Sequence, residues 1–446
     1  MKFIPNSSIK KEMLNEIGLN DINDLFSDVP KKLRLKNLDL PNGLSQIETT
    51  KKLRQIACRN RSYNEIVCFL GGGIKPHYIP SAVKSILSRS EFYTSYTPYQ
   101  SEASQGFLQA MFEYQSMIAE LTAMDISNAS LYDGITALGE AALMCSRINK
   151  RKKFVIPNNI SWQKKSVLKN YTKGAGIEII EVPFDKKSGK IDLDALNKSV
   201  DENTSGVYIE NPNFFGVFED DVEQINKIVK TADSLFVVGI DPVSLGICKS
   251  PGDYGADIVI GEGRALGIPM DFGGISLGLF SCKKEYLRNM PGRVIGLTKD
   301  ADGKRAFCMT LQTREQHIRR ARATSNICTN EGLCSLAATA YLSWLGSNGL
   351  QDLSKINFEQ GQKLAKKILS VNGFSIIFTG SHFNEFVIKC SKNPKQINSK
   401  LLKKGIQGGL ILEEFPDLEN CMLFGITELH TDLDIERLVS ALKEVA

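Results

Sequence analysis

The stretch Leu235-Phe-Val-Val-Gly-Ile-Asp241-Pro242 decides the fold. Its apolar run ends on a carboxylate and has no polar alternation, which is typical of a strand buried on both faces of a parallel sheet. Further apolar runs lie before and after it: Phe154–Pro157, Ile177–Val182, Gly206–Ile209, Ile258–Ile260 and Ile275–Phe280. Helical stretches such as Ile135–Ile148 and Val222–Thr231 lie between several of these runs. This alternation predicts an α/β domain with a mostly parallel sheet covered by helices.

The flanking segments predict three parts around that sheet. Residues 1–65 are polar and contain short helical patterns at Ile9–Ile17 and Gly43–Cys58, which indicates a helical arm. Residues 66–325 form the large α/β domain, with a long helix expected at Ser104–Met124. Residues 326–446 hold a connecting helix, expected over Arg314–Leu345, and a small C-terminal α+β domain. The small domain is expected to contain these strands, and a closing helix that Thr431 caps: Ser375–Phe378, Glu385–Lys389 and Met422–Ile426.

Composition excludes several classes of protein. Apolar residues make up 42% of the 446 residues and charged residues 24%, which is enough apolar material for a large core. The net charge of +5 is too small to indicate nucleic-acid binding. No apolar run reaches the ~18 residues of a membrane helix, and no signal peptide is evident. The ten cysteines form no Cys-x-x-Cys pair and the four histidines are widely separated, so we expect no metal site and a cytoplasmic protein with reduced thiols.

The order of these parts resembles fold-type-I enzymes that use pyridoxal phosphate. In that fold, a turn at a helix N-terminus holds the phosphate, an Asp at a strand end keeps the pyridine nitrogen protonated, and a Lys forms the Schiff base. Tyr132–Ala137, including Thr136, is the candidate phosphate turn. Asp133 within it is an anion that can cap the helix and repel a phosphate, so a capped helix without a ligand is the competing interpretation.

Of the other two features, the sequence contains the strand-end aspartate but not the lysine. Asp241 is present at the end of its strand, where open α/β sheets place ligand-binding groups, although a strand-end Asp can also be a simple loop cap. The lysine is missing, because Gly255–Ser281 contains none and Arg264 lies where it would be sought. A guanidinium stays protonated and cannot serve as the amine nucleophile. The sequence therefore predicts a vestigial cofactor site at Asp133, Thr136, Asp241 and Arg264.

Five further stretches make the resemblance specific: Tyr96–Gly106, Asn128–Ala137, Gly261–Gly274, Arg314–Arg320 and Ala323–Thr329. In this order they resemble the two-subunit form of glycine dehydrogenase (decarboxylating), the P protein of the glycine cleavage system, and within it the lysine-free subunit. The resemblance implies an α2β2 heterotetramer in which the sister subunit carries pyridoxal phosphate. It also implies that glycine is decarboxylated and that its aminomethyl group passes to the lipoyl arm of the H protein.

The resemblance also gives a role to a tyrosine-rich loop just before the long helix at Ser104. Tyr96, Thr97, Tyr99, Gln100 and Glu102 offer aromatic faces and hydrogen-bonding groups suited to a flat cofactor and a small polar substrate. We expect this loop to complete an active site at the subunit interface; a packing corner is the alternative.

Two other motifs leave their interpretation open. Gly71–Tyr78 has the glycines of a phosphate cradle but lacks a P-loop ending, so a tight turn near the interface is favoured. The basic residues between Arg314 and Arg322 can form either a solvated helix face or a carboxylate-binding surface.

Two rival functions remain at this stage. The chain can be a purely structural scaffold with no residue near the chemistry. It can also be a self-sufficient pyridoxal-phosphate enzyme whose lysine lies elsewhere, for example Lys249 or Lys283.

Overall fold

The computed structural model describes residues 7–35, 37–95, 97–271, 275–327 and 329–445. The chain divides into two compact units, residues 1–61 and 62–446. In the first unit, helices α1 (Lys10–Glu16) and α2 (Gln46–Ala57) form close to the two predicted helical patterns. Ser45 and Glu48 close a capping box at the start of α2. Many apolar side chains of this unit are exposed, among them Leu35, Leu38, Leu40, Leu44, Ile47 and Leu53.

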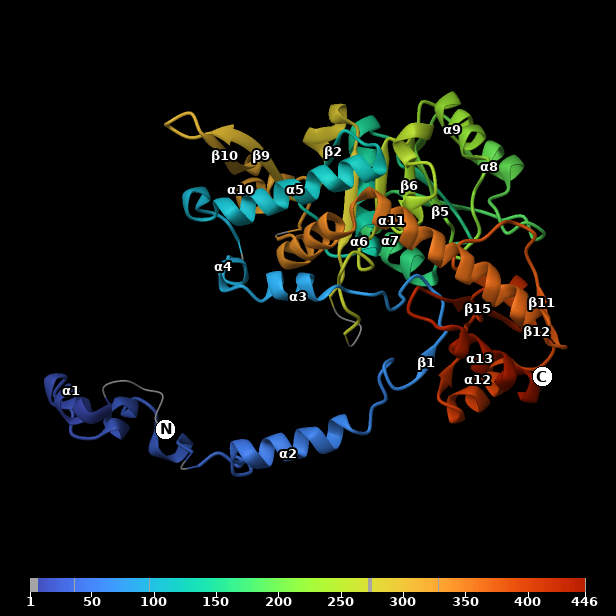
Figure 1. Ribbon diagram of the computed structural model, residues 1–446. Helices are drawn as coiled ribbons and strands as arrows, with labels where there is room; N and C mark the ends of the chain where they lie inside the picture. The colour runs from blue at the N-terminus through green and yellow to red at the C-terminus, as the bar shows by residue number, and fades with distance from the viewer. Residues whose placement is uncertain (1–6, 36, 96, 272–274, 328, 446) are drawn as a thin grey trace. The chain divides into compact units, whose positions relative to one another are not determined.

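A seven-stranded sheet forms the centre of the second unit (Figure 1). Its strands lie in the order β2-β8-β7-β6-β5-β3-β4. Strands β4, β3, β5, β6 and β7 are parallel to one another, β8 pairs antiparallel with β7, and β2 at the edge pairs antiparallel with β8. The bounds are Ile126–Ser127 for β2, Lys153–Pro157 for β3, Glu178–Val182 for β4, Thr204–Asn211 for β5, Leu235–Ile240 for β6, Ile258–Glu262 for β7 and Gly278–Cys282 for β8. The predicted mostly parallel sheet is confirmed; the last strand begins three residues later than expected.

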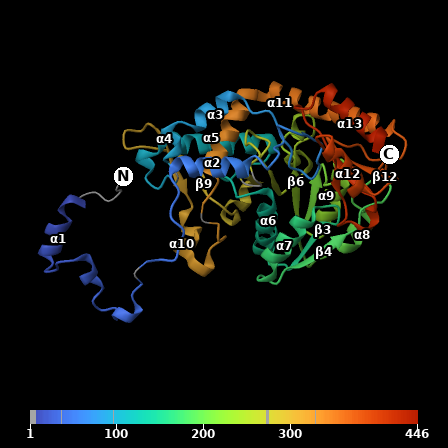
Figure 2. The ribbon, with the colours of Figure 1, turned by 90° about the horizontal axis from the view of Figure 1, so that it is seen from below.

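Helices cover both faces of this sheet, as the unbroken apolar strands predict. Along β6, Phe236 and Val238 pack into the core beneath one group of helices, whereas Leu235 and Val237 pack into the core on the opposite face. The first face is covered by α5 (Gln105–Thr122), α8 (Leu193–Ser199), α9 (Val222–Thr231) and α11 (Gly332–Leu369). The second face is covered by α6 (Gly134–Asn149) and α7 (Trp162–Lys173). Figure 2 shows α6 and α7 on the side of the strands opposite α5 and α11.

The expected helix Arg314–Leu345 is wrong at both ends. Residues 312–322 form three short helical turns, and the chain leaves the helical region at Arg320, whose φ is 51°. Helix α11 begins only at Gly332 and continues to Leu369, with a kink at Gly346 (φ 62°, ψ −176°). It therefore reaches well into the small domain instead of ending before it. In the described part of the chain, no helix is long and apolar enough to cross a membrane.

The small domain is a four-stranded antiparallel sheet in the order β11-β12-β15-β14. These strands are Phe374–Ile376, Glu385–Cys390, Cys421–Gly425 and Leu410–Ile411, and they pack on the C-terminal part of α11 and on α12 (Pro394–Lys403) and α13 (Asp432–Val445). Thr431 and Asp434 exchange hydrogen bonds at the start of α13, so the predicted cap is confirmed.

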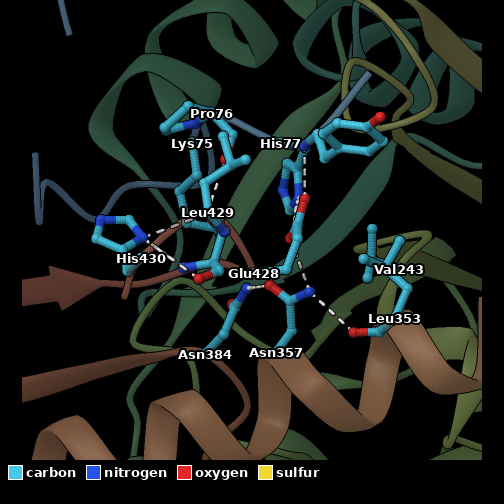
Figure 3. A network of polar contacts seen from close by, with 12 residues as sticks. Lys75, Pro76, His77, Val243, Leu353, Asn357, Asn384, Glu428, Leu429 and His430 are labelled. Atoms are coloured by element: carbon cyan, nitrogen blue, oxygen red, sulfur yellow. Dashed lines mark hydrogen bonds and ion pairs between the residues drawn. The ribbon is translucent and has the colours of Figure 1, made fainter. Parts of the chain in front are cut away.

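One buried carboxylate fastens this domain to the rest of the unit (Figure 3). Glu428 Oε2 lies 3.0 Å from His77 Nδ1, Glu428 Oε1 accepts from the Tyr78 N–H at 2.7 Å, and Oε2 accepts from Asn357 Nδ2 at 3.0 Å. Asn384 donates in turn to the Asn357 side-chain oxygen at 3.0 Å. Burial alone would raise the pKa of Glu428, but the hydrogen bonds from these groups outweigh it and lower the pKa to about 2. Glu428 thus joins the glycine-rich loop, α11 and the small domain.

We expect Glu428→Gln to lower the free energy of unfolding by up to about 3 kcal/mol at pH 7, the equivalent of a pKa lowered from 4.5 to about 2. Because the folded-state pKa is depressed, this stabilisation is present above pH 4.5 and is lost as the pH falls toward 2. Urea midpoints of wild type and variant should therefore converge on acidification. Glu436→Gln, at an exposed position of α13, is the control and should leave the midpoint unchanged at every pH. A constant difference between wild type and Glu428→Gln at all pH values would contradict the prediction.

Candidate active-site cleft

A cleft of about 360 Å³ lies at the carboxyl ends of β3, β5, β6 and β7. Chain order changes direction between β3 and β5, and this switch point is where open α/β sheets bind ligands. The predicted residues Asp133, Asp241 and Arg264 all line the cleft, and Thr136 is hydrogen-bonded to Asp133. The structure therefore brings the four residues of the predicted vestigial site together.

The helix end that would hold a phosphate is already bonded to carboxyl groups of this chain. Asp133 is the N-cap of α6 and accepts from the Thr136 N–H at 2.6 Å. Glu262, from the end of β7, accepts from the Gly134 N–H at 3.1 Å. The other Glu262 oxygen accepts from the backbone N–H groups of Arg264 and Leu277 at 3.0 and 3.1 Å. Burial raises the pKa of Glu262 despite these donors. Two of the N–H groups that could bind phosphate in such a turn, those of Gly134 and Thr136, are thus engaged.

At the opposite end of the cleft, a lysine lies against the strand-end aspartate. Lys75 Nζ is 4.0 Å from Asp241 Oδ2 and 3.0 Å from Glu385 Oε2, and its side chain is only 2% exposed. Burial lowers the pKa of the Lys75 amine, but the charges of Glu385 and Asp241 outweigh it, so that the net pKa is raised. The ammonium therefore stays charged and supplies the positive group that Asp241 would otherwise find in a protonated pyridine.

The glycine-rich loop holds a carboxylate rather than a phosphate. Glu385 Oε1 accepts from the N–H groups of Gly72 and Gly73 at 2.6 and 3.0 Å. Both glycines have positive φ, 109° and 87°, a conformation that turns successive N–H groups toward one anion. The carboxylate comes from the first residue of β12, in the small domain. The loop is thus a cradle that is filled by the chain itself.

Among the described residues that line the cleft, the remaining cations are also engaged by the chain itself. Arg264 is 5% exposed, and its guanidinium donates to Ser276 Oγ at 2.8 Å. Lys164 Nζ is bound to Glu210 at 2.6 Å, and Glu210 also accepts from the Tyr208 hydroxyl at 2.8 Å. These residues do not fit the cofactor. The helix end is engaged, Asp241 already faces a cation, and an arginine stands where a nucleophilic amine is needed.

The predicted interface loop lies apart from this cleft. None of its described members, Thr97, Tyr99, Gln100 and Glu102, lines the cleft, and Tyr96 lies outside the described residues. Tyr99 is 62% exposed. The guanidinium carbon of the buried Arg293 lies over the Tyr99 ring, 5.5 Å from the ring centroid. The loop therefore presents an aromatic face outward, over a buried cation.

Sequence reasoning did not identify Lys75, Glu262 and Glu385 as site residues. Lys75 lies within the Gly71–Tyr78 motif, which the sequence marks as a tight turn. Nothing in that motif indicates Glu385, the carboxylate with which Lys75 pairs. Glu385 follows Gly72 by 313 positions, and nothing local connects the two. Glu262 was visible two residues before Arg264, and a carboxylate at that point could have indicated that the phosphate turn is blocked.

Comparisons with known proteins agree with this architecture. The model of the family described as glycine cleavage system P-protein matches residues 1–442. A Thermococcus kodakarensis protein named probable glycine dehydrogenase (decarboxylating) subunit 1 is 48% identical, over 99% of this chain and 98% of its own. A Desulfitobacterium hafniense protein of the same name is 45% identical over the full length of both chains.

Solved structures give the same result. A crystal structure of glycine decarboxylase (P-protein) of the glycine cleavage system, in inhibitor-bound form, superposes with a TM-score of 0.91 at 39% identity and covers both chains completely. A cysteine desulfurase from Thermococcus onnurineus, at 15% identity, superposes with a TM-score of 0.63 over 86% of this chain and 95% of its own. The second likeness shows the shared fold alone.

The Lys75 ion pair gives a direct test of how the cleft is held. Lys75→Met leaves Glu385 and Asp241 without their buried cation, and we expect it to destabilise the chain by about 3–5 kcal/mol. Adding Glu385→Gln should recover part of this loss, because the two residues are coupled. Lys249→Met is the matched control, since Lys249 pairs with Glu223 at an exposed position, and it should cost under about 1 kcal/mol. Thermal unfolding of the four proteins measures this, and equal effects of Lys75→Met and Lys249→Met would contradict the prediction.

Proposed function

Because the chain belongs to the glycine cleavage system P-protein family, we propose that it is the lysine-free subunit of a two-subunit glycine-decarboxylating enzyme, active only with its sister subunit. The observation that carries this proposal is the cleft at the sheet's switch point. It has the position of a cofactor site, but Glu262 engages the helix end and Arg264 replaces the nucleophile. The fold is kept while the chemistry that would make it self-sufficient is absent from this cleft.

The sister subunit, on this proposal, binds pyridoxal phosphate through its own lysine. The cofactor supplies the electron sink for decarboxylation. Glycine loses its carboxyl group as CO2, and the aminomethyl group passes to the lipoyl arm of the H protein. We propose an α2β2 assembly in the cytoplasm. The nine described cysteines are free thiols, as is usual in a reducing compartment, which supports that location.

Two features of this chain support contact with a sister subunit. The arm within residues 1–65 exposes many leucine and isoleucine side chains, which is unfavourable unless another surface covers them. The loop from Thr97 to Glu102 exposes Tyr99 in the same way. We propose that the arm packs on the sister subunit, that residues 66–325 and 326–446 act as large and small domains, and that the loop reaches the shared active site.

The self-sufficient alternative is less favourable. Neither Lys249 nor Lys283 is among the described residues that line the cleft; Lys249 pairs with Glu223, and Lys283 pairs with Asp257 at 2.6 Å. Lys75 does line the cleft, but its raised pKa keeps it protonated, and a Schiff base requires a neutral amine. The scaffold alternative differs from our proposal only in the role of the loop.

We expect the isolated chain to be inactive in glycine–bicarbonate exchange and active when its lysine-bearing sister and the H protein are added. Borohydride reduction with pyridoxal phosphate, followed by peptide mapping, should find no stoichiometric adduct on this chain and one on the sister. The sister assayed alone is the control that separates activation from simple addition. Full exchange by this chain alone, or one stoichiometric adduct on it, would reverse the proposal.

We expect Tyr99→Phe to lower kcat/KM of the reconstituted enzyme by roughly one to three orders of magnitude, the range of one transition-state hydrogen bond. The substitution keeps the aromatic volume and removes only the hydroxyl. If the tyrosine merely packs, stability should fall by about 1 kcal/mol with normal kinetics. Tyr63→Phe, at an exposed position of the same unit, is the control. Wild-type kinetics of Tyr99→Phe in an intact tetramer, checked by sizing, would favour the scaffold alternative.

A further inference from the structure

Two arginines, the buried Arg293 and the half-buried Arg314, lie outside the cleft. Arg293 follows Gly292, immediately before β9 (Val294–Lys299), and Arg314 lies in the short turn after β10 (Arg305–Thr310). Gly292 has a φ of 76°, and a side chain there would meet the Asn128 amide, so the bend that turns Arg293 inward requires glycine. The Arg314 carbonyl accepts from the Thr324 N–H at 3.2 Å, which closes the base of the loop between them. The start of β9 and the end of β10, which pair antiparallel, thus bring two guanidinium groups to one place.

Arg293 is buried without any short hydrogen bond in the described part of the chain. Only 4% of the residue is exposed. Its guanidinium nitrogens lie 3.4 Å from the Tyr99 hydroxyl, 3.5 Å from Asn330 Oδ1 and 4.0 Å from Glu315 Oε2. A guanidinium has five donors, and a buried charge normally has close partners because desolvation is costly. All three contacts are longer than the ordinary 2.7–2.9 Å of a charge-assisted hydrogen bond.

Arg314 is in a similar position. One of its terminal nitrogens donates to the Gly292 carbonyl at 2.6 Å, whereas the other, Nη1, has no hydrogen-bond partner among the described residues. Arg293 Nε is also without such a partner there. Burial lowers the pKa of Arg314, and the neighbouring Glu315 carboxylate only partly opposes this effect.

The two arginines line one small cavity of about 10 Å³, together with Glu315, Thr324 and Ser325. This volume holds about one water-sized atom. Arg293 and Arg314 contribute two positive charges and Glu315 one negative charge, so the lining is net positive. Ser325 is turned away to donate to Glu140 at 2.8 Å. A cation is disfavoured by this charge, and the space suits one oxygen of an anionic group whose remainder lies at the rim.

We propose that Arg293 and Arg314 form a binding site for a single oxyanion, a carboxylate or a phosphate group, with the Tyr99 hydroxyl at its rim. An oxyanion has acceptor oxygens for the unused guanidinium donors, and arginine binds such groups in a forked geometry. The oxyanion has two possible sources: a free small anion, or an anionic group on a molecule that the sister subunit holds. The second source rests on the proposed function; the first does not.

The first arm of the test uses the full chain alone. Potassium phosphate, acetate and chloride are titrated at constant ionic strength while the thermal midpoint is followed. Phosphate or acetate should raise the wild-type midpoint in a saturable way, and chloride should not. Arg293→Lys and Arg314→Lys keep the charge and lose the fork, and they should bind about ten- to a hundredfold more weakly, the range of one or two charge-assisted hydrogen bonds. Arg322→Gln, an exposed arginine of the same loop, should bind as wild type.

The second arm uses the tetramer reconstituted with the sister subunit. If the oxyanion comes from that side, the isolated chain gives no response, and Arg293→Lys instead weakens cofactor retention or raises KM for glycine ten- to a hundredfold. Sizing and circular dichroism verify assembly and folding, and Arg314→Lys serves if Arg293→Lys does not fold.

A response in the first arm assigns a free anion, and a response in the second arm alone assigns the sister's ligand. Equal behaviour of wild type and both lysine variants in both arms overturns the proposal, as does an equal response to chloride. An inactive wild-type tetramer counts against the proposed function and leaves the first arm intact.

Discussion

The buried ion pair between Lys75 and Glu385 holds together the parts of the structure that matter for function. The lysine comes from the glycine-rich loop, the glutamate from the small domain, and Asp241 from the central sheet completes the cluster. Charges buried this deeply are stable only when each has a partner, so the three segments must meet in one arrangement. Glu428 fastens the same loop and the same domain a short distance along the chain. Glu385 and Glu428 thus hold the glycine-rich loop, which lines the cleft, against the small domain.

The same interactions explain why the residues of this cleft do not fit a cofactor with a phosphate and a protonated ring. A ligand with a phosphate and a protonated ring needs free N–H groups at one end and an unpaired carboxylate at the other. Here the helix end is bonded to Asp133 and Glu262, and Asp241 faces Lys75. Carboxylates of the chain itself therefore accept from the Gly134 and Thr136 N–H groups at one end, and form ion pairs with the Lys75 ammonium at the other.

Sequence patterns anticipated the elements that depend on local chemistry. The apolar run at Leu235–Ile240, the carboxylate of Asp241 and the cap at Asp133 are all readable within a few residues, and the structure has them where the patterns place them. The start of α11 was misplaced because the basic residues around Arg314 resemble one turn of a charged helix. The backbone there is broken at Arg320, and the Arg314 side chain turns inward. The pairing of Glu385 with Gly72 and Gly73 spans the small and large domains, so no local pattern could reveal it.

The contrast between the two charged regions indicates where this chain still has chemistry to offer. In the cleft, Lys75 and Lys164 each have a carboxylate within 3.0 Å. Beside the tyrosine loop, Arg293 has no described partner closer than 3.4 Å, although its side chain is nearly as buried as that of Lys75, 4% exposed against 2%. Burying a guanidinium whose donors lack close acceptors costs stability, and an oxyanion bound there would offset this cost. Tyr99 lies over the Arg293 guanidinium, which puts the proposed oxyanion site beside the tyrosine loop and outside the cleft.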